Sequence, residues 1–198
     1  ITTGDYNVAI GYKAGDTITS GVRNTIVGTS AGDALTTGGY NVAIGMYALS
    51  AEDGHGKNVA IGYDALKVQN AGADAYNVAV GYDTGVAVTT GSRNTIIGAL
   101  TGNALTTGYY NTALGYEALS SSQSGRHAVA IGYQALMTEA STNTETYNVA
   151  VGYRAGYLVS TGVNNTLIGG TAGDALTTGT NNVAMGYGAL GSEDTGGQ

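Results

Sequence analysis

The stretch Asn58-Val59-Ala60-Ile61-Gly62 is one copy of a five-residue phrase that, with close variants, recurs along the whole chain. The copies begin at Asn7, Asn24, Asn41, Asn58, Asn77, Asn94, Asn111, Ala128, Asn148, Asn165 and Asn182, most of them 17 residues apart. A repeat this short cannot bury a hydrophobic face by itself, so each copy has to stack on its neighbours. The sequence therefore predicts an all-β fold, a parallel β-solenoid of eleven coils that forms a single domain over residues 1–198.

We number each coil from its Asn as position 1, and the residue before that Asn is position 0. Position 4 is a large aliphatic residue in every coil, such as Ile61 or Val80, and position 2 is Val or Thr. Alternate residues of a strand share a face, and large aliphatic side chains favour a core, so we predict that positions 2 and 4 point inward. Position 5 is Gly in all eleven coils and is expected to end the strand.

The second half of each coil shows an exchange between positions 9 and 12. Where position 9 is Gly, position 12 is aliphatic, as in Gly85 and Val88. Where position 9 is Leu, position 12 is polar, as in Leu66 and Gln69. Because packing density in a protein core is nearly constant, the exchange predicts that every coil inserts one large side chain from its second half by one of two routes.

The Gly-type and Leu-type coils alternate in pairs, so a longer repeat runs from Tyr6 to Tyr76 and again from Tyr76 to Tyr147. Length variation is confined to the Leu-type coils, at residues 67–75 and 137–146. Solenoids often carry their variable loops and binding surfaces on one edge, so we predict a binding edge there. Both ends of the chain fall at repeat boundaries, and we expect the chain to be a segment of a longer fibre.

Composition argues against several classes of partner. Seven basic and fourteen acidic residues give a net charge of −7, which disfavours binding to the phosphates of nucleic acid. No apolar run approaches the roughly 20 residues of a membrane helix, so we predict no membrane insertion by this segment. The chain has no Cys, and it carries no nucleophile elbow, Walker loop or His-Glu-x-x-His motif. We therefore predict a protein that is not an enzyme, with no cofactor.

Position 3 lies on the opposite side of the strand from positions 2 and 4, yet it is also apolar in every coil. A strand that is apolar on both faces is typical of burial on both faces, and a coil of 17 residues is too narrow to cover its own second face. We therefore predict that other copies of the chain cover it, with a homotrimer as the preferred assembly. The small residues expected at the trimer interface are Ala60, Ala79, Ala130 and Ala150.

Position 0 alternates between aromatic and basic residues along the chain, and we call this row the stripe. Its central members are Tyr40, Lys57, Tyr76, Arg93, Tyr110, His127 and Tyr147. Parallel coils stack about 4.8 Å apart, so each cation can lie over a neighbouring ring. The stripe has two interpretations: a self-contained ladder that stiffens the surface, or a surface that stacks on sugars and binds acidic glycans.

Candidate metal ligands are weaker signals. The repeated Asn at position 1 favours a ladder of amide hydrogen bonds rather than a metal or glycan site. One acidic oxygen per coil falls short of the six to eight oxygen ligands of calcium, which argues against a site at Asp16, Asp33 and Asp174, with Asn103 in the same place. His55 and His127 lie in distant coils, so a zinc pair within one chain is not expected. The sequence predicts no bound metal.

The repeat resembles the head repeats of trimeric autotransporter adhesins, the YadA-like heads, through Asn77-Val78-Ala79-Val80-Gly81 and its copies. The phrases Gly115-Tyr116-Glu117-Ala118-Leu119 and Thr106-Thr107-Gly108 are also similar to those of phage tail-fibre proteins. The resemblance implies a left-handed β-roll, three tightly associated chains, and attachment to a host-surface glycan or receptor. It also implies an extracellular place, on a cell or virion surface.

Two rival functions remain open. The chain could be a purely structural subunit of an extracellular filament, because an uncapped solenoid end is an unpaired β edge that can contact a like subunit end to end. An ice-binding solenoid needs a flat and regular array of Thr. Here Thr alternates irregularly with Val at position 2, where we expect it to point inward, so this function is less favoured.

Overall fold

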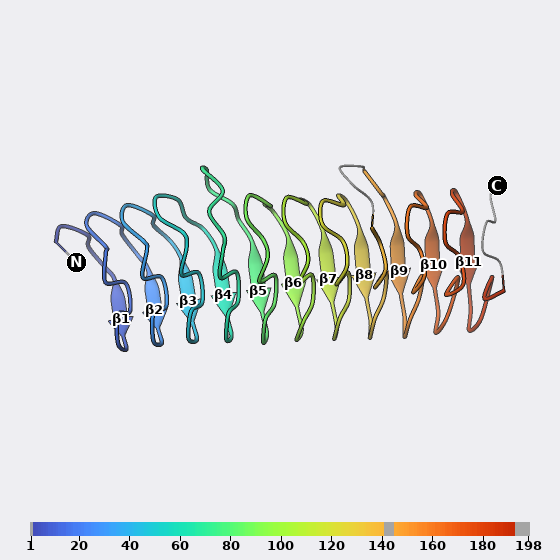
Figure 1. Ribbon diagram of the computed structural model, residues 1–198, viewed down its shortest axis with the longest axis horizontal. Coiled ribbons are helices and arrows are strands. Elements are labelled where there is room, and N and C mark those ends of the chain that lie inside the picture. The colour runs from blue at the N-terminus through green and yellow to red at the C-terminus, as the bar shows by residue number, and fades with distance from the viewer. Residues whose placement is uncertain (1, 141–144, 193–198) are drawn as a thin grey trace.

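The structure is a computed structural model that describes residues 2–140 and 145–192. The chain winds as an elongated parallel β-solenoid whose coils stack along the long axis, with the first and last strands at opposite ends of the rod (Figure 1). This confirms the predicted all-β parallel β-solenoid. No helix among the described residues is long and apolar enough to cross a membrane.

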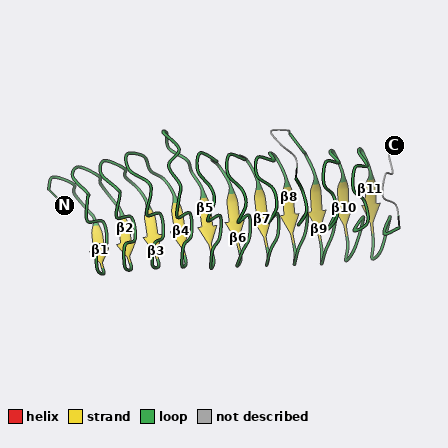
Figure 2. Cartoon of the chain, viewed as in Figure 1, coloured by secondary structure: helices red, strands yellow, loops and turns green. Residues whose placement is uncertain are grey.

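Each coil contributes one strand of three residues, and the rest of the coil consists of turns and loops (Figure 2). The strands are β1 (Val8–Ile10), β2 (Thr25–Val27), β3 (Val42–Ile44), β4 (Val59–Ile61), β5 (Val78–Val80), β6 (Thr95–Ile97), β7 (Thr112–Leu114), β8 (Val129–Ile131), β9 (Val149–Val151), β10 (Thr166–Ile168) and β11 (Val183–Met185). Every strand pairs in parallel with the next one along the chain. The register aligns equal positions of the repeat, so that Ala79 lies between Ala60 and Ile96.

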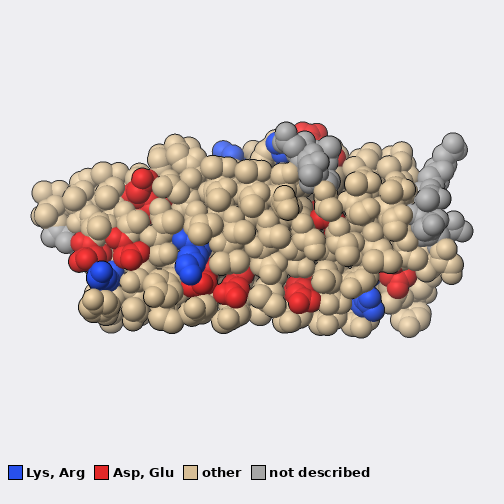
Figure 3. Space-filling model, viewed as in Figure 1, with Lys and Arg blue, Asp and Glu red and all other residues tan. Residues whose placement is uncertain are grey.

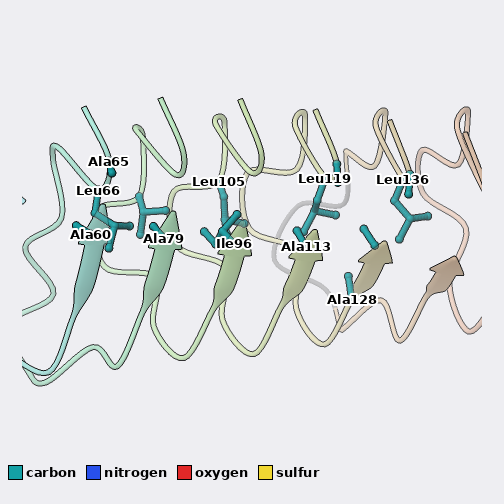
Figure 4. Packing of buried hydrophobic residues seen from close by; sticks show 14 of the residues in the cluster. Ala60, Ala65, Leu66, Ala79, Ile96, Leu105, Ala113, Leu119, Ala128 and Leu136 are labelled. Atoms are coloured by element: carbon teal, nitrogen blue, oxygen red, sulfur yellow. The ribbon is translucent and has the colours of Figure 1, made fainter. Parts of the chain in front are cut away.

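The two faces of each strand point in the directions opposite to those predicted. Position 3 points into the coil: Ala79 is fully buried, whereas its neighbours Val78 and Val80 are partly exposed. The prediction failed because the coil is narrow and its interior is filled from the opposite wall. Leu66, Leu119 and the other large side chains of the second half point toward the strands, and in most coils only Ala fits against them (Figure 4).

The predicted exchange between positions 9 and 12 is confirmed. Leu66 at position 9 and Val88 at position 12 are both fully buried, and both belong to the same core cluster. A Cβ built on Gly85 would lie 3.1 Å from Ile96 Cδ1 and 3.2 Å from both Leu66 Cδ2 and Val88 Cγ2. The space that a side chain at Gly85 would need is therefore occupied by three large neighbours.

A second exchange, which sequence reasoning missed, involves position 3. This residue is Ala in most coils but Ile26, Ile96 or Leu167 in the second coil of each Gly-type pair. These large side chains are buried and pack over the Gly at position 9 of their own coil: a Cβ on Gly102 would lie 3.0 Å from Ile96 Cγ2. In these coils the Leu that position 9 lacks is thus replaced by two large side chains, at positions 3 and 12, rather than by one.

The backbone turns repeat at four positions of each coil where φ is positive: 0, 5, 7 and 9. At position 5 only Gly fits, because a Cβ on Gly62 would lie 2.1 Å from the carbonyl oxygen of Gly81 in the next coil. At position 9 the backbone is the same in both coil types, with φ of 48° at Leu66 and 56° at Gly85. Leu in this conformation is unfavourable in isolation and is stabilised here by its burial.

The Asn at position 1 joins adjacent coils from inside the molecule. The Asn94 side chain accepts a hydrogen bond from the backbone N–H of Asn111 (3.0 Å) and donates to the carbonyl of Gly108 (2.9 Å) in its own coil. Asn94 also donates to Asn77 Oδ1 at 3.2 Å, so the predicted amide ladder is present. Because these side chains are buried, the row serves the fold. Ala128 interrupts it, having no side-chain oxygen to offer the next coil.

Among the described Leu-type coils, the polar residues at position 12, which are Glu52, Gln69, Ser122 and Glu139, are also buried. Gln69 and Glu139 occupy equal places in successive long repeats, and both are fully buried. Gln69 Oε1 accepts a hydrogen bond from Asn77 (2.8 Å), and Glu139 Oε1 accepts one from Asn148 (3.1 Å). Burial raises the pKa of the Glu139 carboxyl, and the hydrogen bond from Asn148 opposes this shift.

Candidate functional site

The outward side of the strands forms a regular surface that runs along the molecule. We call positions 2 and 4 of the strands the strand face. Val or Thr lies at position 2, and Ile, Val, Leu or Met lies at position 4, so the face is largely apolar along its length. Interior members such as Val42 and Ile44 are partly exposed. Eleven strands at about 4.8 Å each make this face about 50 Å long.

The small residues predicted at a trimer axis do not lie on this face. Ala60, Ala79, Ala130 and Ala150 are fully buried inside their own chain, because position 3 points inward. They cannot contact a second chain, and their assignment to an interface is wrong. With the two faces exchanged, the strand face is the apolar face that one chain leaves uncovered.

The stripe at position 0 follows one border of the strand face. All its members have φ between 47° and 64°, a left-handed turn that directs position 0 outward while the following residue at position 1 turns inward. Tyr76 is about half exposed, at 47%. The guanidinium of Arg93 lies 5.9 Å from the ring centre of Tyr76 and 5.4 Å from that of Tyr110. His127 stacks on Tyr110 and on Tyr147, with 5.1 Å between ring centres in each pair.

These contacts confirm the ladder geometry predicted for the stripe. Further links come from hydrogen bonds: Arg23 Nη1 donates to the hydroxyl of Tyr40 at 2.7 Å. Lys57 Nζ lies 2.6 Å from Asp74 Oδ2 and donates to the Tyr76 hydroxyl at 3.0 Å. The hydrogen bond to Asp74 raises the pKa of Lys57, and the same bond lowers the pKa of Asp74. The stripe is therefore fixed by internal contacts while its rings remain half exposed.

A second aromatic row at position 6 was not predicted. Tyr63 stacks on Tyr82 with 5.3 Å between ring centres, and Tyr133 stacks on Tyr116 and Tyr153 at 5.6 Å and 5.3 Å. These rings are exposed and follow the Gly that ends each strand. The recurring Gly-Tyr dipeptide was the signal that could have identified the row. Small residues interrupt it at Thr29, Ala99 and Gly170, each in the second coil of a Gly-type pair.

The predicted variable edge is present in part. The turn within 67–75 rises beyond the turns of the neighbouring coils at the upper edge of the rod in Figure 1. Its counterpart at 137–146 includes residues 141–144, which lie outside the described part of the chain. Arg126 and Glu145 form a parallel bridge beside that segment, and the hydroxyl of Tyr147 donates to Glu145 Oε2 at 2.6 Å.

Charges on the rod are dispersed. Figure 3 shows one face of the molecule, where acidic and basic side chains occur singly or in small groups among neutral ones. Asp16, Asp33, Asn103 and Asp174 recur at one place in their coils. The three aspartates belong to no cluster of three or more His and acidic side chains within 2–140 and 145–192. The described residues also enclose no pocket.

The site that the structure supports is thus an extended, periodic surface: the strand face, with the stripe and the tyrosine row of position 6 beside it. No protein-family model, curated protein or solved structure matches this chain.

Proposed function

We propose that the chain is a non-enzymatic rod segment of a trimeric surface fibre, an adhesin or tail fibre that attaches to a cell or glycan surface. The observation that carries this proposal is the long apolar strand face flanked by exposed aromatic residues. A monomer that leaves such a face in water is prone to associate, and three copies related by an axis along the rod would cover it. The resemblance of the repeat to YadA-like heads supports a trimer and a left-handed winding.

Light scattering tests the assembly. We expect the mass of three chains rather than that of one chain of 19.7 kDa. A variant carrying both Ile44→Lys and Ile131→Lys places charges on the strand face. These charges should separate the chains while the circular dichroism spectrum stays unchanged. Thr107→Lys on an exposed turn is the matched control and should leave the mass unchanged. A wild-type monomer, or a trimer that survives both strand-face charges, would reject this interface.

The attachment surface is the stripe, together with the variable edge. Tyrosine rings that are held by neighbours and half exposed can stack on sugar rings, and Arg and Lys beside them favour acidic sugars. Each site is weak, but three chains and two long repeats offer it many times. Multivalency of this kind can raise binding strength by roughly 10²–10⁴ without a deep pocket.

Glycan and cell-surface arrays test attachment. The wild-type assembly is compared with a variant carrying Tyr76→Ala, Arg93→Ala and Tyr110→Ala, and with a control carrying Tyr116→Ala and Tyr133→Ala in the position 6 row. Selective loss of binding in the first variant supports the stripe. Equal loss in both assigns attachment to a broader aromatic surface, and unchanged binding in both moves it to the variable edge.

A structural filament is the second candidate, favoured by the open sheet: β1 and β11 are its outermost strands, and each pairs on one side only. End-to-end contact of such edges would extend the sheet between subunits. Electron microscopy at rising protein concentration tests it. Growth into long filaments, with no binding on any array, would replace attachment by the filament function.

Ice binding needs a separate test because the threonines at position 2 do not point into the core. Thr25, Thr95, Thr112 and Thr166 point outward on the strand face, not inward as predicted. Their row is still interrupted by Val. We expect no thermal hysteresis, and a clear hysteresis that disappears in Thr95→Lys would favour ice binding instead.

A further inference from the structure

The turn that follows β3 brings together three side chains that can bind a metal ion. Glu52, Asp53 and His55 lie within the four residues Glu52-Asp53-Gly54-His55, and one potential ligand atom from each lies within 4.8 Å of the others. The Glu52 side chain is fully buried, that of His55 is one-third exposed, and Asp53 is exposed. The group therefore reaches from the wall of the solenoid to solvent.

Two of these side chains carry buried atoms that form no hydrogen bond within the described part of the chain. Glu52 Oε1 accepts a hydrogen bond from the backbone N–H of His55 at 3.2 Å, but Glu52 Oε2 has no hydrogen-bond partner there. His55 Nδ1 also has none, although it lies 3.6 Å from Glu52 Oε1. A buried carboxylate oxygen and a buried imidazole nitrogen without partners are unusual in folded proteins, and both are lone-pair donors.

The nearby basic side chain does not satisfy them. Lys57 lies only two residues beyond His55, but its Nζ contacts Asp74 Oδ2 at 2.6 Å and the Tyr76 hydroxyl at 3.0 Å. Asp74 in turn accepts a hydrogen bond from the backbone N–H of Gly56. Lys57 and Asp74 therefore form their own pair beside the turn, and neither Glu52 nor Asp53 pairs with a Lys or Arg among the described residues.

We propose that Glu52, Asp53 and His55 bind one divalent transition-metal ion, with Zn²⁺ as the ion that fits best. Two carboxylates and one imidazole are ligand types that zinc accepts, and a site with three protein ligands leaves a position open to water. The imidazole favours zinc and its neighbours over calcium and magnesium, which take oxygen ligands. Zinc bonds of about 2.0–2.2 Å place the ligand atoms about 3.4 Å apart, so the turn closes slightly on binding.

The chain contains a natural control for this site. In the long repeat that follows, Ser122, Gln123 and Gly125 occupy the places of Glu52, Asp53 and His55. The backbone of the two turns is held alike. Thr36 N–H donates to the Asp53 carbonyl at 2.6 Å, and Thr106 N–H donates to the Gln123 carbonyl at 2.7 Å. The second turn therefore offers the same frame without the ligands.

Titration calorimetry of the full chain with ZnCl₂, and Co²⁺ absorption as a spectroscopic probe, test the site. We expect one ion per chain and a melting temperature that EDTA lowers. Asp53→Asn and His55→Gln should each weaken binding more than about 100-fold, because even residues behind metal ligands change affinity by roughly 10–100-fold. His127→Gln, a histidine of the stripe, should leave zinc binding unchanged.

Transfer of the site gives the sharpest result. A variant carrying Ser122→Glu, Gln123→Asp and Gly125→His should bind a second ion per chain, since the backbone frame is already present. Circular dichroism of each variant confirms that the solenoid is intact. Absence of zinc binding by the wild type, or full binding retained in both Asp53→Asn and His55→Gln, would overturn the proposal.

Discussion

Ala79 and Val80 are neighbours in β5, but they lie in opposite environments. Ala79 is fully buried among side chains of its own chain, whereas Val80 is partly exposed on the strand face. The smaller residue lies inside because the opposite wall of the coil supplies the large side chains. In a narrow solenoid, the size of an apolar residue is therefore a poor guide to which way it points, and the space left by the opposite wall decides.

The largest expected effect tests this difference directly. Ala79→Asp places an isolated carboxylate in the core, which costs several kcal/mol, and should unfold the coils around β5. Val80→Asp, one residue away, should leave a folded chain and affect association instead. Circular dichroism and thermal melting separate the two. Equal collapse of both variants would mean that position 4 is also part of the core.

Ile96 and Ile97 give the same comparison without introducing a charge. Ile96 is 1% exposed and packs over Gly102, whereas Ile97 lies on the strand face. Ile96→Ala should lower the free energy of unfolding by about 2–5 kcal/mol because it leaves a cavity. Ile97→Ala should lower the free energy of unfolding clearly less when the chain is separated from other copies. Urea unfolding of both variants measures the difference, and a larger effect at Ile97 would contradict the observed packing.

Substitutions at Asn94 and Arg93 compare the buried Asn ladder with the exposed stripe. Asn94→Ala leaves the backbone N–H of Asn111 and the carbonyl of Gly108 without partners, at about 1–3 kcal/mol per group. Arg93→Ala removes exposed contacts with two tyrosine rings, each worth about 0.5–1 kcal/mol. Thermal unfolding should rank Asn94→Ala as the more destabilising. The opposite order would indicate that the stripe contributes more stability than the Asn ladder.

Glu139 and Gln69 compare a buried acid with its neutral equivalent in the other long repeat. The unfolded Glu139 carboxyl titrates near 4.5, and burial raises its pKa in the folded chain. The folded state therefore binds more protons between these two values, so the contribution of Glu139 to stability is greatest below about pH 4.5 and is lost as pH rises through the folded pKa.

Glu139→Gln should remove this loss and stabilise the protein at pH 8, because the buried amide carries no charge that has to be desolvated. At pH 4 the variant and the wild type should differ little. Gln69→Glu is the reciprocal control and should introduce a second loss of stability as pH rises. Melting curves from pH 4 to 8 measure both, and a stability difference between the wild type and Glu139→Gln that stays constant over this range would contradict the assignment.

Several features of the fold could be predicted from the sequence because they depend on spacing alone. The repeat of Asn58-Val59-Ala60-Ile61-Gly62 specifies stacked parallel strands in register, and the exchange between Leu66 and Val88 shows that a packed interior exists. The contacts within the stripe also follow from spacing, since equal positions of adjacent coils must lie side by side.

Other features depend on distances across the coil, which the order of residues does not contain. Three such features arise where the strands face the opposite wall of the coil. They are the burial of Gln69 and Glu139, the packing of Ile96 over Gly102, and the unsatisfied atoms of the Glu52 turn. The position 6 row is an intermediate case, because its spacing was visible in the sequence but its exposure was not.

The sequence by itself determined that this chain is a stack of coils, with equal residues placed in rows along one axis, because a regular repeat admits few other arrangements. Only the tertiary structure decided which rows face the interior and which face solvent. That choice follows from the cross-section of the coil, where the volume left by Leu66 and its equivalents admits Ala79 and leaves Val80 outside.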